Sequence, residues 1–322
     1  MRRWFEWLFL IAAVAAPWGV QAQSYPEKPI RLIIAFPAGG GSDVMGRLLA
    51  ARLSERLGQP FVVDNRPGAG GSIGTEGAVK SPPDGYTVLL GSTSEVSINR
   101  SLYTKLSYDP LKDLAPIGMV ATTPMVLVVH PSMPVKDVKQ LVAIAKARPG
   151  QIHYGSAGSG STTHLAAELF KSTAGIDIVH VPYKGAPPAL ADLTGGHVQL
   201  MFSTLPATLP LVHANRLRPL GVSSTKRADT LPQVPTIVEA GFAGYEVEYW
   251  YGLFAPRNTP PQMLAVLTKT LGAALGTAEL QSDIRKQGAE PSVLSLQQFT
   301  AFLSEDAERW RKAVKVSGAT AN

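Results

Sequence analysis

Three loops rich in glycine and serine constrain the fold of this chain more than any other feature of its sequence. They are PAGGGSD (37–43), RPGAGGSIG (66–74) and GSAGSGSTTHL (155–165), and each follows an expected strand and precedes an expected helix. Glycine at such a junction lets the backbone adopt positive φ angles and approach a ligand closely. Short apolar strands that alternate with helices are typical of an α/β fold with a mostly parallel sheet.

This alternation of strands and helices occurs twice. Before residue 124, the patterns predict strands over 30–36, 61–63 and 87–90 and helices over 42–57 and 72–80. After Pro124 they predict strands over 125–129, 152–154, 176–181, 198–202 and 217–222, and helices over 135–147, 162–173 and 188–193. An aromatic extended run over 245–256 then precedes three helices, which begin near residues 260, 277 and 296.

The repeated pattern predicts two α/β lobes with a ligand cleft between them. Lobe 1 is expected to comprise residues 23–123 and 245–322, and lobe 2 residues 124–244. The three C-terminal helices have no strands between them, so we expect them to cover the sheet of lobe 1. The aromatic run is expected to form hinge and core, with Trp250 as a candidate wall of the pocket.

The first 22 residues have the features of a secretory signal peptide. Arg2 and Arg3 precede a mostly apolar stretch over 4–20, and small residues precede the expected cleavage site after Ala22. A membrane anchor is the alternative, but the far end of the apolar stretch lacks a charged flank. No other stretch approaches the ~18 apolar residues that a membrane span needs. We therefore expect an exported, soluble mature protein.

Charge and residue types exclude several classes of function. The chain contains no cysteine, which excludes disulfides, thiolate metal sites and a lipid-modified N-terminal cysteine. Its net charge of +6 comes without the basic cluster that a nucleic-acid partner requires, and a mild positive charge suits a small anion. The six histidines lack the spacing of a metal site, so we expect no metal and no cofactor.

The first turn of each helix behind a glycine loop is a candidate anion site. Its N–H groups have no partner within the helix, and the positive end of the helix dipole lies behind them. The alternative for Ser42, Ser72 and Ser161 is a simple N-cap role. The recurrence of such a loop at three equivalent points favours a site for a carboxylate or a phosphate.

The second loop also allows a catalytic interpretation. GGSIG (70–74) matches the G-x-S-x-G nucleophile elbow, which makes a secreted serine esterase with Ser72 as nucleophile the alternative function. No feature of the sequence selects one histidine and one aspartate as its partners. The glycine spacing from Gly68 differs from the dinucleotide fingerprint, and no Walker lysine follows any of the loops.

Seven motifs, taken together, resemble one known family. In chain order they are YPEKPIRLIIAFPAGGGSD (25–43), VVDNRPGAGGSIGTE (62–76), PDGYTVLLG (83–91), LSYDPLKDLAPI (106–117), HYGSAGSGSTTHLAAELF (153–170), DIVHVPYKGAPPALADLTGGHVQLMF (177–202) and LPQVPTIVEAGF (231–242). They cover essentially the whole mature chain. They are similar to the motifs of the extracytoplasmic solute receptors of tripartite tricarboxylate transporters, the Bug family.

The resemblance implies a periplasmic binding protein of type II whose two lobes close on a small organic carboxylate. It further implies a monomer that performs no chemistry and docks onto a membrane permease with a large and a small subunit. A solute-sensing subunit for a membrane kinase is a further alternative. Many relatives carry Asp or Asn where this chain has Ser203-Thr204, which argues for a plain carboxylate rather than an amino acid.

The candidate ligand-binding residues come from the glycine loops and from the ends of neighbouring strands. Structural roles are the alternatives for Asp43, which suits the helix dipole, for His164, which can pack or cap, and for Lys184, which can be solvated. The full set is Phe36, Ala38, Gly39, Gly40, Ser42, Asp43, Gly70, Gly71, Ser72, Ser92, Ser156, Ala157, Gly158, Ser159, Ser161, Thr162, His164, Lys184, Ser203 and Thr204.

Overall fold

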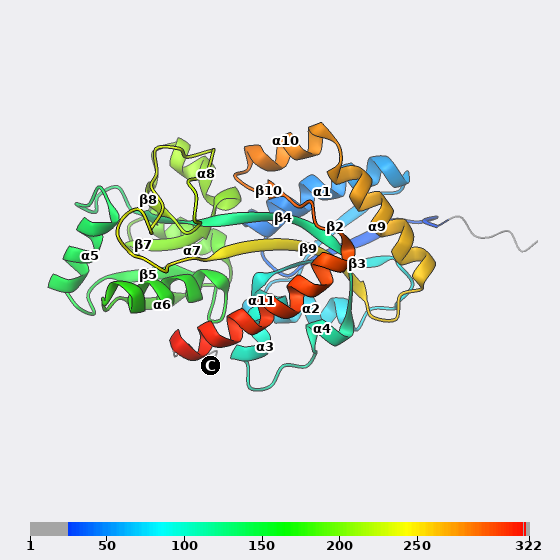
Figure 1. Cartoon of the computed structure of the whole chain (residues 1–322), viewed down its shortest axis with the longest axis horizontal. Coiled ribbons are helices and arrows are strands. Elements are labelled where there is room, and N and C mark those ends of the chain that lie inside the picture. Colours follow the sequence, from blue (N-terminus) through cyan, green and yellow to red (C-terminus); the bar gives the residue numbers. More distant parts are fainter. Residues whose placement is uncertain (1–24, 318, 320–322) are drawn as a thin grey trace, which may run out of the picture.

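The computed structural model describes residues 25–317 and 319 of the chain, so the signal peptide expected over 1–22 lies outside the described residues. Two α/β halves lie end to end along the long axis of the molecule (Figure 1). The strands β4 (Leu114–Val129) and β9 (Glu248–Pro256) run between them. This architecture confirms the two-lobed α/β fold that the sequence predicts.

The first half is built on parallel strands. β1 (Ile30–Ile34) lies between β2 (Phe61–Asn65) and β3 (Thr87–Ser92), and β3 pairs antiparallel with β9. Helix α1 (Gly41–Leu57) follows β1. The 3₁₀ turn η1 (Ala69–Gly71) and helix α2 (Ser72–Val79) follow β2. The apolar side of α1, with Met45, Leu49 and Leu53, is buried in the same core cluster as the residues of β1.

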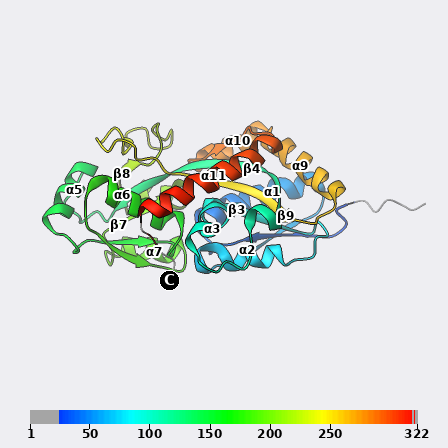
Figure 2. The ribbon, with the colours of Figure 1, turned by 60° about the horizontal axis from the view of Figure 1, so that its bottom comes forward.

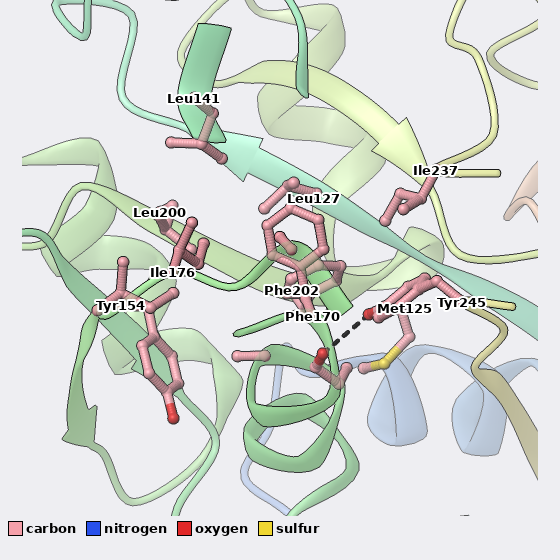
Figure 3. Packing of buried hydrophobic residues seen from close by; sticks show 14 of the residues in the cluster. Met125, Leu127, Leu141, Tyr154, Phe170, Ile176, Leu200, Phe202, Ile237 and Tyr245 are labelled. Atoms are coloured by element: carbon pink, nitrogen blue, oxygen red, sulfur yellow. Dashed lines mark hydrogen bonds between the residues drawn. The ribbon is translucent and has the colours of Figure 1, made fainter. Parts of the chain in front are cut away.

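The second half repeats this arrangement. β5 (His153–Ser156) lies parallel to β6 (Val179–Pro182) and β7 (Leu200–Thr204), and β8 (Arg218–Val222) pairs antiparallel with β4. Its helices are α5 (Val138–Ala147), α6 (Thr162–Ala174), α7 (Ala186–Thr194) and α8 (Leu205–His213). In its core, Phe170 packs on Phe202 and on Tyr245, whose hydroxyl donates to the Ala166 carbonyl at 2.9 Å (Figure 3).

Strand β4 joins the two halves into one hydrogen-bonded sheet with the order β2-β1-β3-β9-β4-β7-β5-β6. Its residues from Leu114 to Pro124 pair with β9, and those from Met125 to Val129 pair with β7 and β8. The sequence pattern predicts only the part from 125 to 129 as a strand. The part from 114 to 124 contains Pro116, Gly118 and Pro124, residue types that are unfavourable inside a strand. Its pairing register with β9 also shifts at two points.

The C-terminal helices do not all cover the first half alone. Helices α9 (Pro261–Leu275) and α10 (Ala278–Lys286) place Leu271 and Ile284 in the core of the first half. Helix α11 (Leu296–Ser317) lies across both halves in Figure 2. Phe299 of α11 packs against Trp250, whereas Trp310 belongs to the core cluster of the second half. This helix therefore stabilises both halves at once.

Several short elements were not predicted. They are the π-helical turn η2 (Thr93–Ile98), α3 (Asn99–Leu102), α4 (Pro110–Asp113), β10 (Glu290–Pro291) and α8. Helix α8 contains Pro206 and Pro210, and Pro206 lies in its first turn, where the missing N–H has no cost. Within the described residues, no single helix has the length and apolar character to cross a membrane, although α9 and α10, bent by 74°, meet both criteria as a pair.

Candidate functional site

Two adjoining cavities lie where the glycine loops of the two halves meet. They share Phe36, Pro37 and Ala157 in their walls. We call the larger one, of about 360 Å³, the outer cavity. We call the smaller one, of about 30 Å³, the inner chamber. Residues before position 104 and residues after position 156 line both of them, so each of these two cavities needs both halves.

The outer cavity combines backbone amides with apolar surface. Its walls contain the glycine loop from Pro67 to Gly71, the rings of Phe36, Tyr103 and Tyr183, and Lys184, together with Pro37, Ala157, Gly158, Ser159, Pro182 and Gly185. Lys184 is its one charged side chain among the described residues. Such a cavity has the volume and the mostly apolar lining of a small-molecule site.

Seven of the residues that line the inner chamber carry a hydroxyl group, and the rest of its wall is apolar or glycine. The seven are Ser42, Ser94, Ser161, Thr163, Ser203, Thr204 and Tyr249. The described residues place no acidic and no basic side chain in its wall. The Ser203 hydroxyl is buried without a hydrogen-bond partner in the described part of the chain. Hydroxyl donors without competing carboxylates suit the oxygen atoms of an anion.

The first glycine loop is held in shape by Asp43. Its carboxylate accepts the Gly39 N–H at 2.9 Å, pairs with Arg47 at 2.9 Å and accepts from the Asn65 amide at 3.0 Å. Burial alone would raise the pKa of the Asp43 carboxyl, but these hydrogen bonds outweigh it and lower that pKa below its ordinary value. Asp43 lies outside both cavity walls, so its contacts are those of a residue that shapes the loop.

The second loop uses left-handed backbone conformations that favour glycine. Gly70 and Gly71 have φ angles of +59° and +92°. The Asn99 side-chain amide donates to the Gly70 carbonyl and to the Ser72 hydroxyl, both at 2.9 Å. Within the described residues, no imidazole is hydrogen-bonded to Ser72. The pattern G-x-S-x-G therefore stands here without the base that an activated serine needs.

The third loop is fixed by two stacked histidines. The His164 Nδ1 atom accepts the Gly160 N–H at 3.2 Å, and the Ser156 hydroxyl bonds His180 Nε2 at 2.6 Å. The two rings stack with centroids 4.0 Å apart. Burial is the largest cause that lowers the pKa of each imidazole from 6.5 to about 4. Both rings are therefore neutral at neutral pH, and His164 supplies a nitrogen lone pair to the loop.

Strand β9 turns a different aromatic ring toward the site than the one expected. Trp250 is fully buried, and its indole N–H donates to Asp306 of α11 at 2.8 Å. It forms no part of either cavity wall, so the expectation that Trp250 walls the pocket is wrong. Its neighbour Tyr249 lines the inner chamber instead, because successive side chains of a strand point to opposite faces.

Direct contacts connect the two halves across the cleft. The hydroxyl oxygens of Ser94 and Thr162 lie 2.8 Å apart, and the Thr162 N–H at the start of α6 donates to Ser94 Oγ at 3.1 Å. A Cβ atom built on Gly185 would lie 2.3 Å from Pro37 Cγ, so the loops also touch tightly at this point. The arrangement is that of a cleft closed over its cavities.

Comparison with known proteins identifies the family. The model of the tripartite tricarboxylate transporter family receptors matches residues 45–318. The chain belongs to this receptor family. Protein BugT of Bordetella pertussis is 39% identical over 309 residues, which cover 96% of this chain and 94% of BugT.

Two solved structures of similar proteins were determined with ligands. Rpa4515 of R. palustris with adipate is 41% identical, with a TM-score of 0.90 over 92% of this chain and 99% of that one. MatC of Rhodopseudomonas palustris with bound malate is 28% identical, with a TM-score of 0.86 over 90% of this chain and 100% of that one.

The candidate residues of this receptor fall into two groups. Those in a cavity wall are Phe36, Gly40, Ser42, Gly70, Gly71, Ala157, Gly158, Ser159, Ser161, Lys184, Ser203 and Thr204. Those behind or beside the walls are Ala38, Gly39, Asp43, Ser72, Ser92, Ser156, Thr162 and His164. Wall residues that the sequence analysis did not name include Gly41, Ser94, Tyr103, Thr163, Tyr183 and Tyr249.

Two of these omissions had a signal in the sequence. Ser94 lies two residues beyond Ser92 at the same strand end, in the polar stretch STSE (92–95). Tyr249 lies in the aromatic run that was singled out, one position before Trp250. Tyr103 and Tyr183 belong to no pattern that distinguishes them from other surface tyrosines.

Proposed function

We propose that this receptor binds a small organic carboxylate in the periplasm by closing two lobes on it, and that it performs no chemistry on the ligand. We assign residues 23–123 and 245–322 to lobe 1 and residues 124–244 to lobe 2. Residues 1–22 act as the cleavable signal peptide that directs export. The ligand is then delivered by a monomeric receptor to a membrane permease with a large and a small subunit.

One observation carries this proposal. The inner chamber gathers hydroxyl groups of both halves, and no carboxylate lies in its wall among the described residues. One carboxylate group of the ligand binds there, and the Gly70 N–H with Lys184 meets the other end in the outer cavity. The Gly71 N–H donates to the Gly68 carbonyl at 3.0 Å, so it fixes the shape of the loop instead. The apolar rings of the outer cavity suit a hydrocarbon chain between the two ends.

The relatives support this choice of ligand class. Rpa4515 was solved with adipate and MatC with malate, and both ligands are dicarboxylates. Ser203 and Thr204, the last residues of β7, place no carboxylate in the chamber that could pair with a ligand ammonium group. The proposal is therefore a plain carboxylate, with dicarboxylates as the first compounds to test.

Closure explains how binding is transmitted. Ser42 and Tyr249 come from one side of the chamber and Ser161, Thr163 and Ser203 from the other. A ligand that touches both sets binds the closed form better than the open form. It therefore shifts the balance toward closure. We expect the Ser94–Thr162 contact, with its oxygens 2.8 Å apart, to break when the lobes open.

A thermal-shift screen of the mature chain tests the proposal. The panel contains adipate, malate, tricarboxylates, aromatic acids and amino acids, with the neutral diamide of adipic acid as matched control. A ligand at about 100 times its Kd adds about 2.7 kcal/mol of stability, which raises the melting temperature by several degrees. We expect a shift with at least one carboxylate and none with the diamide.

The same protein separates the rival functions. Labelling by a fluorophosphonate probe that disappears in Ser72→Ala would favour the esterase. Failure of every carboxylate in the panel to shift the melting temperature would refute the proposed function.

A further inference from the structure

A buried carboxyl group lies behind the wall of the inner chamber. Glu95 of η2 is 0% exposed, and its Oε1 atom has no hydrogen-bond partner within the described part of the chain. Its Oε2 atom lies 2.6 Å from the Ser92 hydroxyl oxygen, at hydrogen-bond distance. Burial raises the pKa of the Glu95 carboxyl to about 8. The group is therefore mostly protonated at neutral pH.

A chain of hydroxyl groups links this carboxyl to the chamber. The Tyr249 hydroxyl oxygen lies 2.7 Å from Ser92 Oγ, and Ser92 Oγ lies 2.6 Å from Glu95 Oε2. The Tyr249 hydroxyl also lies 3.3 Å from Ser42 Oγ, and both residues line the inner chamber. Because hydroxyl hydrogens rotate, such a chain can run in either of two directions.

The protonation of Glu95 selects the direction. An ionised carboxylate only accepts, so Ser92 must donate to it and Tyr249 must donate to Ser92. The Tyr249 oxygen then turns lone pairs toward the chamber. A protonated Glu95 can donate to Ser92, which then donates to Tyr249, and the Tyr249 O–H points into the chamber. Only the second direction suits a bound carboxylate.

We propose that Glu95 is a positioning residue that acts through Ser92 to make the Tyr249 hydroxyl a donor to the ligand carboxylate, so that ligand binding is coupled to the proton on Glu95. This inference rests on the proposed function. Affinity then falls as the pH rises through the pKa of Glu95. The limiting slope is about tenfold per pH unit, because one proton is linked to binding.

Other titratable and charged groups lie on the elements packed against η2. They are Arg100 of α3, Lys112 and Asp113 of α4, His164, Glu168 and Lys171 of α6, Glu248, Tyr249 and Tyr251 of β9, and Glu305, Asp306, Glu308, Arg309, Arg311, Lys312 and Lys315 of α11; Tyr108 and Asp109 lie just before α4. Burial, with a smaller contribution from Glu95, raises the pKa of each of Tyr108, Tyr249 and Tyr251 above the ordinary value for a tyrosine. Arg100 pairs with Asp109, and Arg309 with Asp306. The three tyrosines therefore keep their hydroxyl protons over the pH range in which Glu95 titrates.

Calorimetric titration with adipate and malate between pH 6.5 and 9.5 tests the coupling. For the wild type we expect a constant Kd up to about pH 7.5 and a rise of about thirtyfold from pH 7 to 9.5. Glu95→Gln is expected to bind with a Kd that stays within about threefold over this range, because its amide donates to Ser92 at every pH. Tyr249→Phe is expected to bind about tenfold more weakly at pH 7, because it lacks the hydrogen bond to the anion, and without the slope.

Glu248→Gln is the matched control, because Glu248 precedes Tyr249 in β9, its pKa is also raised by burial, and it lies outside the hydroxyl chain. It is expected to follow the wild type. If Glu95→Gln does not fold, Ser92→Ala takes its place. This variant interrupts the chain of hydroxyl groups but keeps the Glu95 carboxyl, and its Kd is expected not to change with pH. A flat wild-type profile, or a slope that survives in these variants, overturns the inference alone. Failure of every carboxylate to bind at pH 6.5 overturns the proposed function as well.

Discussion

Replacement of His164 by asparagine should remove part of the acid sensitivity of the fold. The His164 imidazole is 5% exposed, its Nδ1 atom accepts the Gly160 N–H at 3.2 Å, and its ring stacks on His180. The asparagine side-chain oxygen takes the position of Nδ1 and can accept the same N–H. His164→Asn therefore keeps the contact to the third glycine loop and removes the titrating group.

The magnitude follows from the shift of the pKa. Burial, with a smaller effect of Lys171, lowers the pKa of His164 from 6.5 to about 4. The unfolded chain binds this proton more readily than the folded chain, so the contribution is fully present above pH 6.5 and is lost as the pH falls toward 4. Linkage gives a loss of about 2 kcal/mol between pH 7.5 and pH 5.0, and about 3 kcal/mol at the acid limit.

Urea unfolding followed by circular dichroism at pH 7.5 and pH 5.0 measures this loss. The difference between the two pH values should be about 2 kcal/mol smaller in His164→Asn than in the wild type. His213→Asn, which removes an exposed imidazole, is the matched control and should behave as the wild type. Equal pH dependence in the wild type and His164→Asn would refute the interpretation that a buried neutral imidazole holds this loop.

Three further variants test the cavities by calorimetry. Gly71→Val should abolish carboxylate binding, because the backbone there has φ +92° and an added Cβ would lie 3.1 Å from Glu95 Cβ. Gly58→Val is its control and should still bind, because Gly58 also has a positive φ, +67°, but an added Cβ would meet nothing within 4 Å. Ser203→Asp should weaken binding at least tenfold by placing a charge in the inner chamber, and unchanged affinity would contradict the site. Ser72→Ala should weaken binding less than about tenfold, because it loses one neutral hydrogen bond; complete loss would require a direct role for this hydroxyl.

The strand–glycine–helix junctions were the part of the site most accessible from sequence. Glycine at 70 and 71 is required by the backbone itself, which adopts φ +59° and +92° there. A requirement of this kind is local, so it can be recognised in the sequence without knowledge of the tertiary contacts. The position of Asp43 in the first turn of its helix was also predictable. Its contacts to Gly39 and Asn65, which make it a residue that shapes the loop, were not.

Features that depend on pairing between distant segments were not predictable in this way. The long strand β4 contains Pro116, Gly118 and Pro124, which read as a loop until β9 lies beside them. The sequence suggested Trp250 as the aromatic wall of the pocket, whereas the neighbouring Tyr249 lines the inner chamber. Which face of β9 meets the cleft is set by its pairing with β3 and β4, and a shift of one position exchanges the faces.

Glu95 shows a third kind of limit. The stretch STSEVS (92–97) reads as a polar surface loop, and nothing in it indicates that the glutamate is buried. The π-helical turn η2 turns Glu95 inward, and helix α11 contributes Asp306 from the far end of the chain to bond Ser97 at 2.6 Å. Burial of a charged residue is decided here by tertiary contacts that the local sequence does not record.

Cross-linking of Ser94→Cys with Thr162→Cys tests the central claim, closure on a carboxylate, most directly. The chain has no other cysteine, and the two hydroxyl oxygens lie 2.8 Å apart across the cleft, so a disulfide with its bond of about 2.05 Å can form when the lobes close. Adipate or malate is predicted to accelerate disulfide formation, measured by mass spectrometry under mild oxidation, while the neutral diamide leaves the rate unchanged. A cross-linking rate that no carboxylate alters would contradict the account.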